Sequence, residues 1–257
     1  MVCDKVRIRF RKSGDLRLVS HHDLMRCFER MLRRAELPFH STSGFHPKPR
    51  LVFALSLPLG VVGCEEVVEL ELDAETDPEQ VRERLARVAP AGLEILGARR
   101  IDPKTGAQAG RATYRIAVPH ERAGDLPGRV AEILIAAECW VERTRPRPRR
   151  INLRPYVHNI RVLPDTLEIA LWITPTGSAR AEEVLNLLGL GDLLTAGAVL
   201  ERIKLELHDE TLIQDSVPDP VPDPVPDAGH LPMKGAESGT GSGTGMGTDR
   251  SQRQDSA

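Results

Sequence analysis

The chain has 257 residues, of which 40% are hydrophobic and 28% are charged, a composition typical of a globular protein. Its net charge of −2 hides an asymmetry, because the segment from Asp209 onward carries nine acids and three bases, leaving 32 bases and 28 acids before it. The four cysteines lie far apart in the sequence, imply no disulfide framework and show none of the close spacings of metal ribbons and iron–sulfur loops.

The first predicted element is a strand over residues 6–11, in which apolar side chains alternate with arginines. This period of two places Arg7, Arg9 and Arg11 on one face, which we expect to meet solvent. Ser20 then caps a predicted helix, whose apolar residues recur at helical spacing. This helix ends before Pro38.

Further along the chain, two similar series of elements are predicted. The first continues with strands at 51–57 and 68–72, a helix at 77–89 and a strand at 93–101. After turn formers at 102–111, the second has a strand at 114–118, a helix at 121–136, extended segments at 138–143 and 156–163, a strand at 167–173, a helix near 180–189 and a strand at 203–207.

The first series has the order β-α-β-β-α-β, and a similar order recurs in the second; this order is typical of the split βαβ or ferredoxin-like arrangement. We therefore predict an α+β fold of two tandem ferredoxin-like units with antiparallel sheets, residues 1–101 and 112–208, joined by a linker at 102–111. Residues 209–257 are predicted to be a disordered acidic tail, because Pro-Asp repeats and a Gly/Ser/Thr stretch cannot bury enough apolar surface to fold. The charged N-terminus and the lack of a long apolar run predict a cytoplasmic protein without signal peptide or membrane helix.

The first helix and the loop after it hold the densest basic cluster. Arg26, Arg30 and Arg33 stand at i, i+4 and i+7 and therefore share one helix face. With Lys48 and Arg50 in the loop they are candidate phosphate contacts, and Phe45 offers a ring on which a base can stack. The alternative interpretation is an ordinary solvated helix face.

Two other basic segments strengthen the nucleic-acid interpretation. One is the arginine face of the first strand, and the other is a proline-spaced run with the candidate residues Arg145, Arg147, Arg149 and Arg150. Prolines keep that run extended, so its arginines can reach successive phosphates. The run can equally be a mobile surface loop. We favour polyanion binding, because clustered like charges repel unless a partner offsets them.

His21 and His22 stand at the start of the first helix, where the helix dipole favours a neutral imidazole that can act as a general base. With His40 and His46 they could instead hold a metal, but no pair has the i, i+4 spacing of helical ligands. We therefore predict no metal and no cofactor. Capping and packing are the simpler roles for both histidines.

Residues 6–72 carry a set of short motifs: Arg9-Phe10-Arg11-Lys12, Gly14-Asp15-Leu16-Arg17, Ser20-His21-x-Asp23-Leu24-x-Arg26, Arg33-Arg34-Ala35 and Ser43-Gly44-Phe45-x-Pro47-x-Pro49-Arg50. With these motifs the segment resembles the radical-SAM-linked domain of unknown function, a bacterial family found fused to, or encoded beside, radical SAM proteins. The chain lacks the C-x-x-x-C-x-x-C triad of a radical SAM cluster, so the resemblance implies a radical SAM partner on a separate polypeptide. The predicted fold with a histidine on its first helix is also similar to CRISPR repeat-processing endoribonucleases.

Three functions remain open at this point. The first is an RNA-binding accessory protein that presents a structured RNA, such as tRNA or rRNA, to a separate radical SAM enzyme. The second is a metal-independent endoribonuclease that uses His21 or His22. The third is a protein-interaction scaffold for the radical SAM partner, in which the basic segments meet acidic protein surface.

Overall fold

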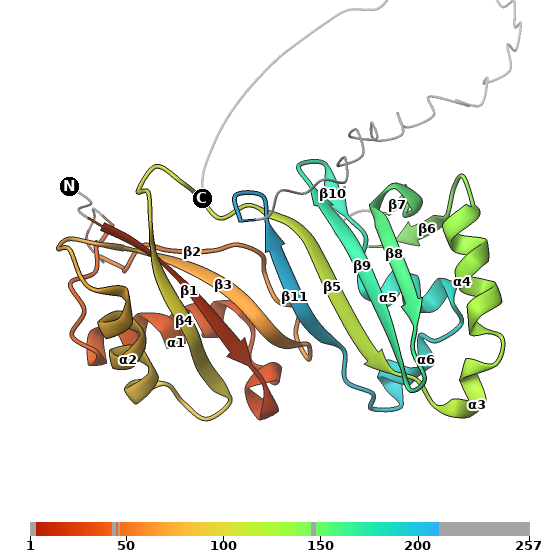
Figure 1. Ribbon diagram of the computed structural model, residues 1–257, viewed down its shortest axis with the longest axis horizontal. Helices are drawn as coiled ribbons and strands as arrows, with labels where there is room; N and C mark the ends of the chain where they lie inside the picture. Colours follow the sequence, from red (N-terminus) through yellow and green to blue (C-terminus); the bar gives the residue numbers. More distant parts are fainter. Residues whose placement is uncertain (1–3, 43–44, 46, 145–147, 211–257) are drawn as a thin grey trace, which may run out of the picture. The chain divides into compact units, whose positions relative to one another are not determined.

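The computed structural model describes residues 4–42, 45, 47–144 and 148–210. Within these ranges the protein is a mixed α+β structure built mainly on β-sheet (Figure 1). We call residues 4–101 the N-terminal half and residues 109–207 the C-terminal half. Of the predicted tail, Asp209 and Glu210 belong to the described residues, and 211–257 lie outside them.

Both halves begin with a long strand followed by helix. The N-terminal half contains β1 (Asp4–Lys12), a 3-10 helix (Gly14–Leu18), α1 (His21–Arg34), β2 (Leu51–Phe53), β3 (Val62–Leu72), α2 (Pro78–Val88) and β4 (Leu93–Ile101). The C-terminal half contains β5 (Ala109–Ala117), α3 (His120–Ala123), α4 (Leu126–Ile135), β6 (Trp140–Arg143), β7 (Arg149–Asn152), a 3-10 helix (Arg154–Tyr156), β8 (Val157–Val162), β9 (Thr166–Thr174), β10 (Gly177–Ser178), α5 (Ala181–Leu187), α6 (Asp192–Thr195) and β11 (Glu201–Leu207).

Among the described residues, nine strands form one sheet that runs through both halves. In the N-terminal half β1 pairs antiparallel with β3 and β4, and β2 pairs with β3. In the C-terminal half β5 pairs antiparallel with β9 and β11, and β8 pairs with β9. The halves join where β11 runs parallel to β3, with Glu201 opposite Val62 and Arg202 opposite Gly63. The two predicted sheets are thus parts of a single sheet.

The helices that form the main core lie on one face of this sheet. In the N-terminal half, Val6, Ile8 and Phe10 of β1 pack against α1 and α2. In the C-terminal half, Ile116 and Ile169 pack against α4 and α5. We call this the helix face, and we call the side that carries Arg7 and Arg9 of β1 the open face.

Several predicted elements differ in extent from the observed ones. The strand expected at 51–57 is only β2, because the carbonyls of Leu55 and Ser56 accept hydrogen bonds from Arg202 instead of continuing the ladder. The helix expected at 121–136 is broken into α3 and α4, with Gly124 between them and a proline in the first turn of α4. The expected linker at 102–111 is shorter, because β5 begins at Ala109. The extended segments predicted at 138–143 and 156–163 contain β6 and β8, and between them β7, which was not predicted, forms a separate two-stranded hairpin with β6.

None of the helices in the described ranges combines the length and the hydrophobicity needed to span a bilayer.

Candidate nucleic-acid interface

Helix α1 forms as its capping and apolar pattern predict. The side chain of Ser20 accepts a hydrogen bond from the backbone N–H of Asp23 at 3.2 Å and donates to the Asp23 carboxylate at 2.7 Å. The apolar stripe, which includes Leu24, Phe28 and Met31, is buried against the sheet. The opposite side of the helix is consequently exposed, and it carries Arg26, Arg30, Arg33 and Arg34.

The loop after α1 lies against the C-terminal end of this helix. Its two sides are held together by hydrogen bonds from Thr42 N–H to the Lys48 carbonyl at 2.9 Å and from Arg50 N–H to the His40 carbonyl at 3.0 Å. Arg33 connects helix and loop, because its guanidinium donates to the Pro47 carbonyl at 3.4 Å. It also lies 5.3 Å from the ring centroid of Phe39, a cation–π contact.

This arrangement gathers most of the predicted basic residues of the helix and loop on one surface. Lys48 and Arg50 are exposed, and the ring of Phe45 is fully exposed. Arg50 does not join them, because it stands opposite Glu71 of β3 and pairs with this glutamate on the open face. We call the remaining set the α1–loop surface: Arg26, Arg30, Arg33, Arg34, Phe45 and Lys48.

The charge on the α1–loop surface is only weakly offset. Within the described part of the chain, Arg30, Arg34 and Lys48 take part in no ion pair. Arg26 pairs with Asp23 at 3.3 Å and is well exposed. Exposed pairs of this kind contribute little energy, so these guanidiniums remain available to bind a phosphate.

A groove adjoins the α1–loop surface at Arg30. Its volume is about 620 Å³, and its lining includes Leu18, Asp23, Arg30 and Leu59. Leu18 is 58% exposed and Leu59 is 65% exposed, so the groove presents apolar side chains beside a guanidinium. Because the Asp23 carboxylate also lines it, the groove offers apolar surface without a net positive charge.

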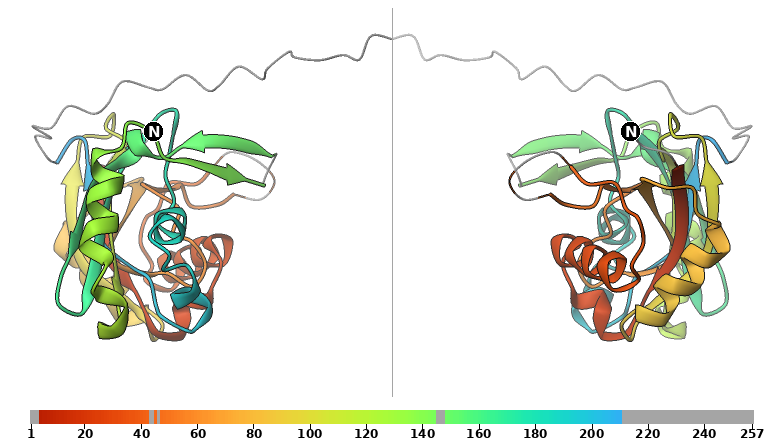
Figure 2. Two further views of the ribbon diagram at one scale, coloured as in Figure 1. Left: turned by 90° about the vertical axis from the view of Figure 1, so that its right-hand side faces the viewer. Right: turned by 90° about the vertical axis from the view of Figure 1, so that its left-hand side faces the viewer.

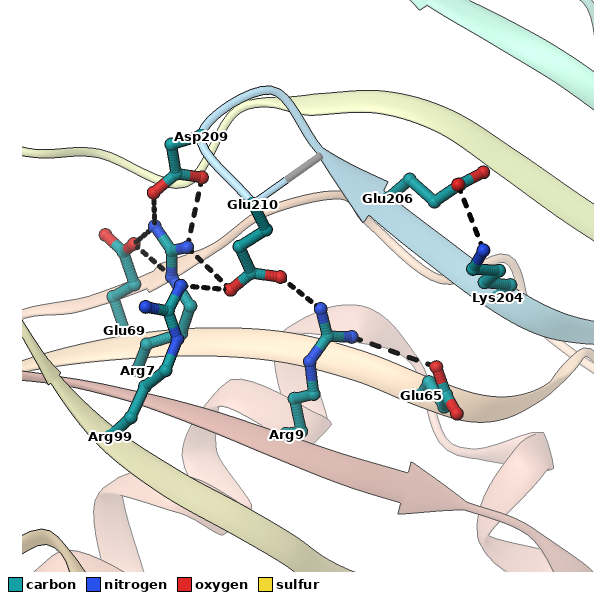
Figure 3. Close-up of polar contacts among 9 residues, drawn as sticks. All are labelled: Arg7, Arg9, Glu65, Glu69, Arg99, Lys204, Glu206, Asp209 and Glu210. Carbon is teal, nitrogen blue, oxygen red and sulfur yellow. Dashed lines mark hydrogen bonds and ion pairs between the residues drawn. The ribbon is translucent and has the colours of Figure 1, made fainter. Parts of the chain in front are cut away.

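The arginines of β1 do not join this surface, because they lie on the open face. The expectation that all three meet solvent is wrong for Arg7, which is 1% exposed. Glu69 of β3 accepts hydrogen bonds from Arg7 at 2.7 and 3.0 Å, and Asp209 and Glu210 cover it from the chain segment after β11 (Figure 3). Arg9 is partly buried and paired with Glu210, whereas Arg11 is exposed.

Buried charges on the open face are matched by opposite ones. Burial alone would lower the pKa of Arg7, but its hydrogen bonds with Asp209, Glu210 and Glu69 raise it instead. In the C-terminal half the same face carries ion pairs between neighbouring strands: Arg111 with Glu206, Arg115 with Glu201 and Arg161 with Glu168. The open face is thus a network of ion pairs, and the less compensated positive charge lies on the α1–loop surface.

The third basic segment lies on the hairpin of β6 and β7. Arg149 and Arg150 are exposed on β7, and Arg150 lies 5.2 Å from the ring centroid of the half-exposed Trp140. The other two candidates, Arg145 and Arg147, lie outside the described residues. Figure 2 shows the hairpin extending on the same side of the sheet as α1. The sequence did not single out Trp140, because its pairing with Arg150 depends on the hairpin register, although a tryptophan near an arginine run is itself a signal.

The two candidate catalytic histidines occupy different environments. The ring of His21 packs edge-on against Phe53 with centroids 5.0 Å apart, and its Nδ1 atom is buried without a hydrogen-bond partner. Burial, followed by the charges of His22 and Lys12, lowers the pKa of His21, which favours the neutral ring. His22 is exposed, and the two ring centroids are 6.5 Å apart.

The other histidines considered as metal ligands do not join this pair. The Nδ1 atom of His40 lies 2.6 Å from the carboxylate of Asp73, and His46 lies outside the described residues. In the ranges that the structure describes, no three His, Cys, Asp or Glu side chains form a group suited to a metal ion.

One family model matches most of the chain. Residues 5–184, which include α1, its loop and the β6–β7 hairpin, match the model described as "Uncharacterized protein conserved in bacteria (DUF2344)". The chain belongs to this family. No curated protein matches the chain. Among solved structures, an unknown protein from Galdieria sulphuraria is similar at 14% sequence identity, with 79% of this chain and 98% of that chain covered and a TM-score of 0.24.

Proposed function

We propose that this DUF2344 protein binds RNA through the α1–loop surface and acts as an accessory protein that presents a structured RNA to a separate modifying enzyme. The observation that supports RNA binding is the composition of this surface: five exposed bases beside one fully exposed phenylalanine. Guanidinium and ammonium groups bind phosphates, and an exposed ring stacks on an unpaired base. Arg150 and Trp140 offer a second pair of the same kind on the same side of the sheet.

Two finer statements belong to this proposal. The hydrogen-bonded orders β4-β1-β3-β2 and β11-β5-β9-β8 support an interpretation as two ferredoxin-like units fused edge to edge. The motifs between Arg9 and Arg50 support a radical SAM protein as the separate enzyme, by resemblance to the radical-SAM-linked domain. A cytoplasmic location is part of the same proposal.

A salt series with matched charge variants tests the RNA interface. The full chain, the triple variant Arg26→Ala, Arg30→Ala, Arg33→Ala and a control triple variant on α2, Arg82→Ala, Arg84→Ala, Arg87→Ala, are titrated with total bacterial RNA and with a single-stranded oligonucleotide. Loss of three phosphate contacts lowers the slope of log affinity against log salt by about 2, since each contact with a single strand contributes about 0.7. We expect this loss in the α1 variant and not in the control.

The outcomes separate RNA binding from the scaffold function. Equal effects of both triple variants would show a response to net charge alone, which contradicts a local interface. If the unaltered chain binds no RNA at any salt concentration, the RNA proposal fails and the basic surface is better explained by an acidic protein partner.

His21 supports a second candidate function, cleavage of the bound RNA. Burial lowers the pKa of its ring, which favours the neutral form that can accept a proton from a ribose 2′-hydroxyl, and a second imidazole lies beside it at the N-terminal end of the basic helix. We expect any such cleavage to persist in EDTA and to be lost in the His21→Ala variant while RNA binding is retained. Gel electrophoresis of a labelled RNA measures the cleavage. Cleavage that continues in the His21→Ala variant excludes His21 as the base.

A further inference from the structure

The open face holds a cluster of cations whose present partners include the last two residues of the described chain. Arg7 and Arg9 come from β1, Arg99 comes from β4, and Asp209 and Glu210 follow β11 (Figure 3). The two carboxylates are thus brought to β1 from about 200 residues further along the chain.

Glu210 is bound by all three guanidiniums. Its Oε1 accepts hydrogen bonds from Arg7 at 2.8 Å and from Arg99, and its Oε2 accepts one from Arg9. Asp209 adds contacts to Arg7 at 2.8 and 3.0 Å. Several guanidiniums converging on the oxygens of one anionic group is the arrangement by which proteins bind phosphate.

The charges of this cluster balance only because Asp209 and Glu210 are present. The bases are Lys5, Arg7, Arg9 and Arg99, and the acids are Glu65, Glu69, Asp209 and Glu210. Four charges of each sign cancel, whereas without the last two acids four bases face two acids. The remaining charge of +2 matches a phosphate dianion or two phosphodiesters.

The segment that carries the two acids is joined to the body by few backbone contacts. His208 N–H donates to the Gln108 carbonyl at 3.0 Å, and Glu210 N–H donates to the Leu207 carbonyl within its own turn at 3.2 Å. Seven of the nine acids from Asp209 onward follow Glu210 in the sequence. A tethered acidic segment has a high effective concentration at the site and therefore competes with an external anion.

We propose that Arg7, Arg9 and Arg99 form a phosphate-binding site for the RNA backbone, and that Asp209 and Glu210 close this site by occupying the positions of the phosphate oxygens. The site lies on the face opposite the α1–loop surface and is therefore a second RNA contact, regulated by the chain's own carboxylates. This inference rests on the proposed RNA-binding function. Release of the acidic segment is expected to strengthen binding and to make it more sensitive to salt.

The test uses full-length chains with neutral isosteres. The variant Asp209→Asn, Glu210→Gln is compared with the control Glu79→Gln, Asp192→Asn, which removes two exposed acids that pair with Arg82 and Arg122 elsewhere. Affinity for a labelled single-stranded RNA is measured over a salt series. In the Asp209→Asn, Glu210→Gln variant the proposal predicts a slope of log affinity against log salt that is steeper by about 1.4, because two further phosphate contacts of about 0.7 each become possible. The control variant is expected to have the slope of the unaltered chain. Equal slopes in all three proteins would overturn it.

Additional variants identify the site and the source of the phosphate. Adding Arg9→Gln and Arg99→Gln to the Asp209→Asn, Glu210→Gln chain must remove the gain, and a gain that persists contradicts the assignment to these arginines. The single variant Glu210→Gln replaces the double variant if thermal unfolding shows that the latter does not fold. Inorganic tripolyphosphate is tested as competitor: displacement of RNA only at high millimolar concentration supports the RNA backbone as the ligand, and displacement at micromolar concentration contradicts it.

If the unaltered chain and both variants bind no RNA, the proposed function fails, and the phosphate site is judged separately. A rise in the melting temperature with tripolyphosphate in the Asp209→Asn, Glu210→Gln variant and not in the control then supports a site for free polyphosphate. The absence of that rise overturns the site itself.

Discussion

At the scale of single residues, the carboxylate of Glu210 shows how a charge is kept on a largely covered surface. Burial alone would raise its pKa, but hydrogen bonds from Arg7 and Arg99 and the charge of Arg9 hold the pKa at about 2, below its usual value of 4.5. The pKa of Glu210 is lower in the folded protein than in the unfolded chain. The stabilisation that its ionised carboxylate gives to the folded state is therefore fully present above pH 4.5 and is lost as the pH falls toward 2.

We therefore expect the Glu210→Gln variant to be less stable than the unaltered chain by about 2 kcal/mol at pH 7, a value reduced from the full shift because the carboxylate is partly solvated. The difference shrinks as the pH falls from about 5 to about 2, since protonated Glu210 no longer differs in charge from glutamine. Urea unfolding at several pH values measures this difference in the free energy of unfolding, and the Glu79→Gln variant serves as an exposed control. A difference that is independent of pH would contradict the role of the ionised carboxylate.

At the scale of elements, the sequence predicts those that are specified locally. The Ser20–Asp23 cap and the apolar stripe after it predict α1, and the alternation from Leu167 to Ile173 predicts β9 within two residues of its observed bounds. The surface of α1 follows from the same spacing, because residues opposite a buried stripe are exposed.

What the sequence could not predict depends on pairing between distant strands. The period of two correctly places Arg7 and Arg9 on one face of β1, but burial of that face follows from the register that sets Glu69 opposite Arg7. Docking of Asp209 and Glu210 onto β1 has no local signal at all, since the composition after Asp209 predicts only a tail. Local spacing thus fixed which residues share a face, and long-range contacts decided which of those faces is free to bind a ligand.

At the scale of the whole molecule, one buried ion pair connects the two halves. Arg202 of β11 donates to Glu66 of β3 at 2.8 Å and through a second, shorter contact, and both side chains are almost fully buried. Gly63 leaves room for this pair, because a Cβ atom there would lie 2.5 Å from the Cγ of Glu66. Arg202 also donates to the carbonyls of Leu55 and Ser56, so it binds the N-terminal half at three points.

Loss of Arg202 should therefore weaken the coupling between the halves. Removing one partner leaves a buried unpaired charge, and we expect Arg202→Met to cost about 3–5 kcal/mol, while the double variant Glu66→Leu, Arg202→Met costs less. Both tryptophans, Trp140 and Trp172, lie in the C-terminal half, so tryptophan fluorescence reports on that half while far-ultraviolet circular dichroism reports on both. In urea the two signals should change together in the unaltered chain and separate in Arg202→Met. Transitions that remain coincident in this variant would show that the strand pairing of β11 with β3 couples the halves without the ion pair.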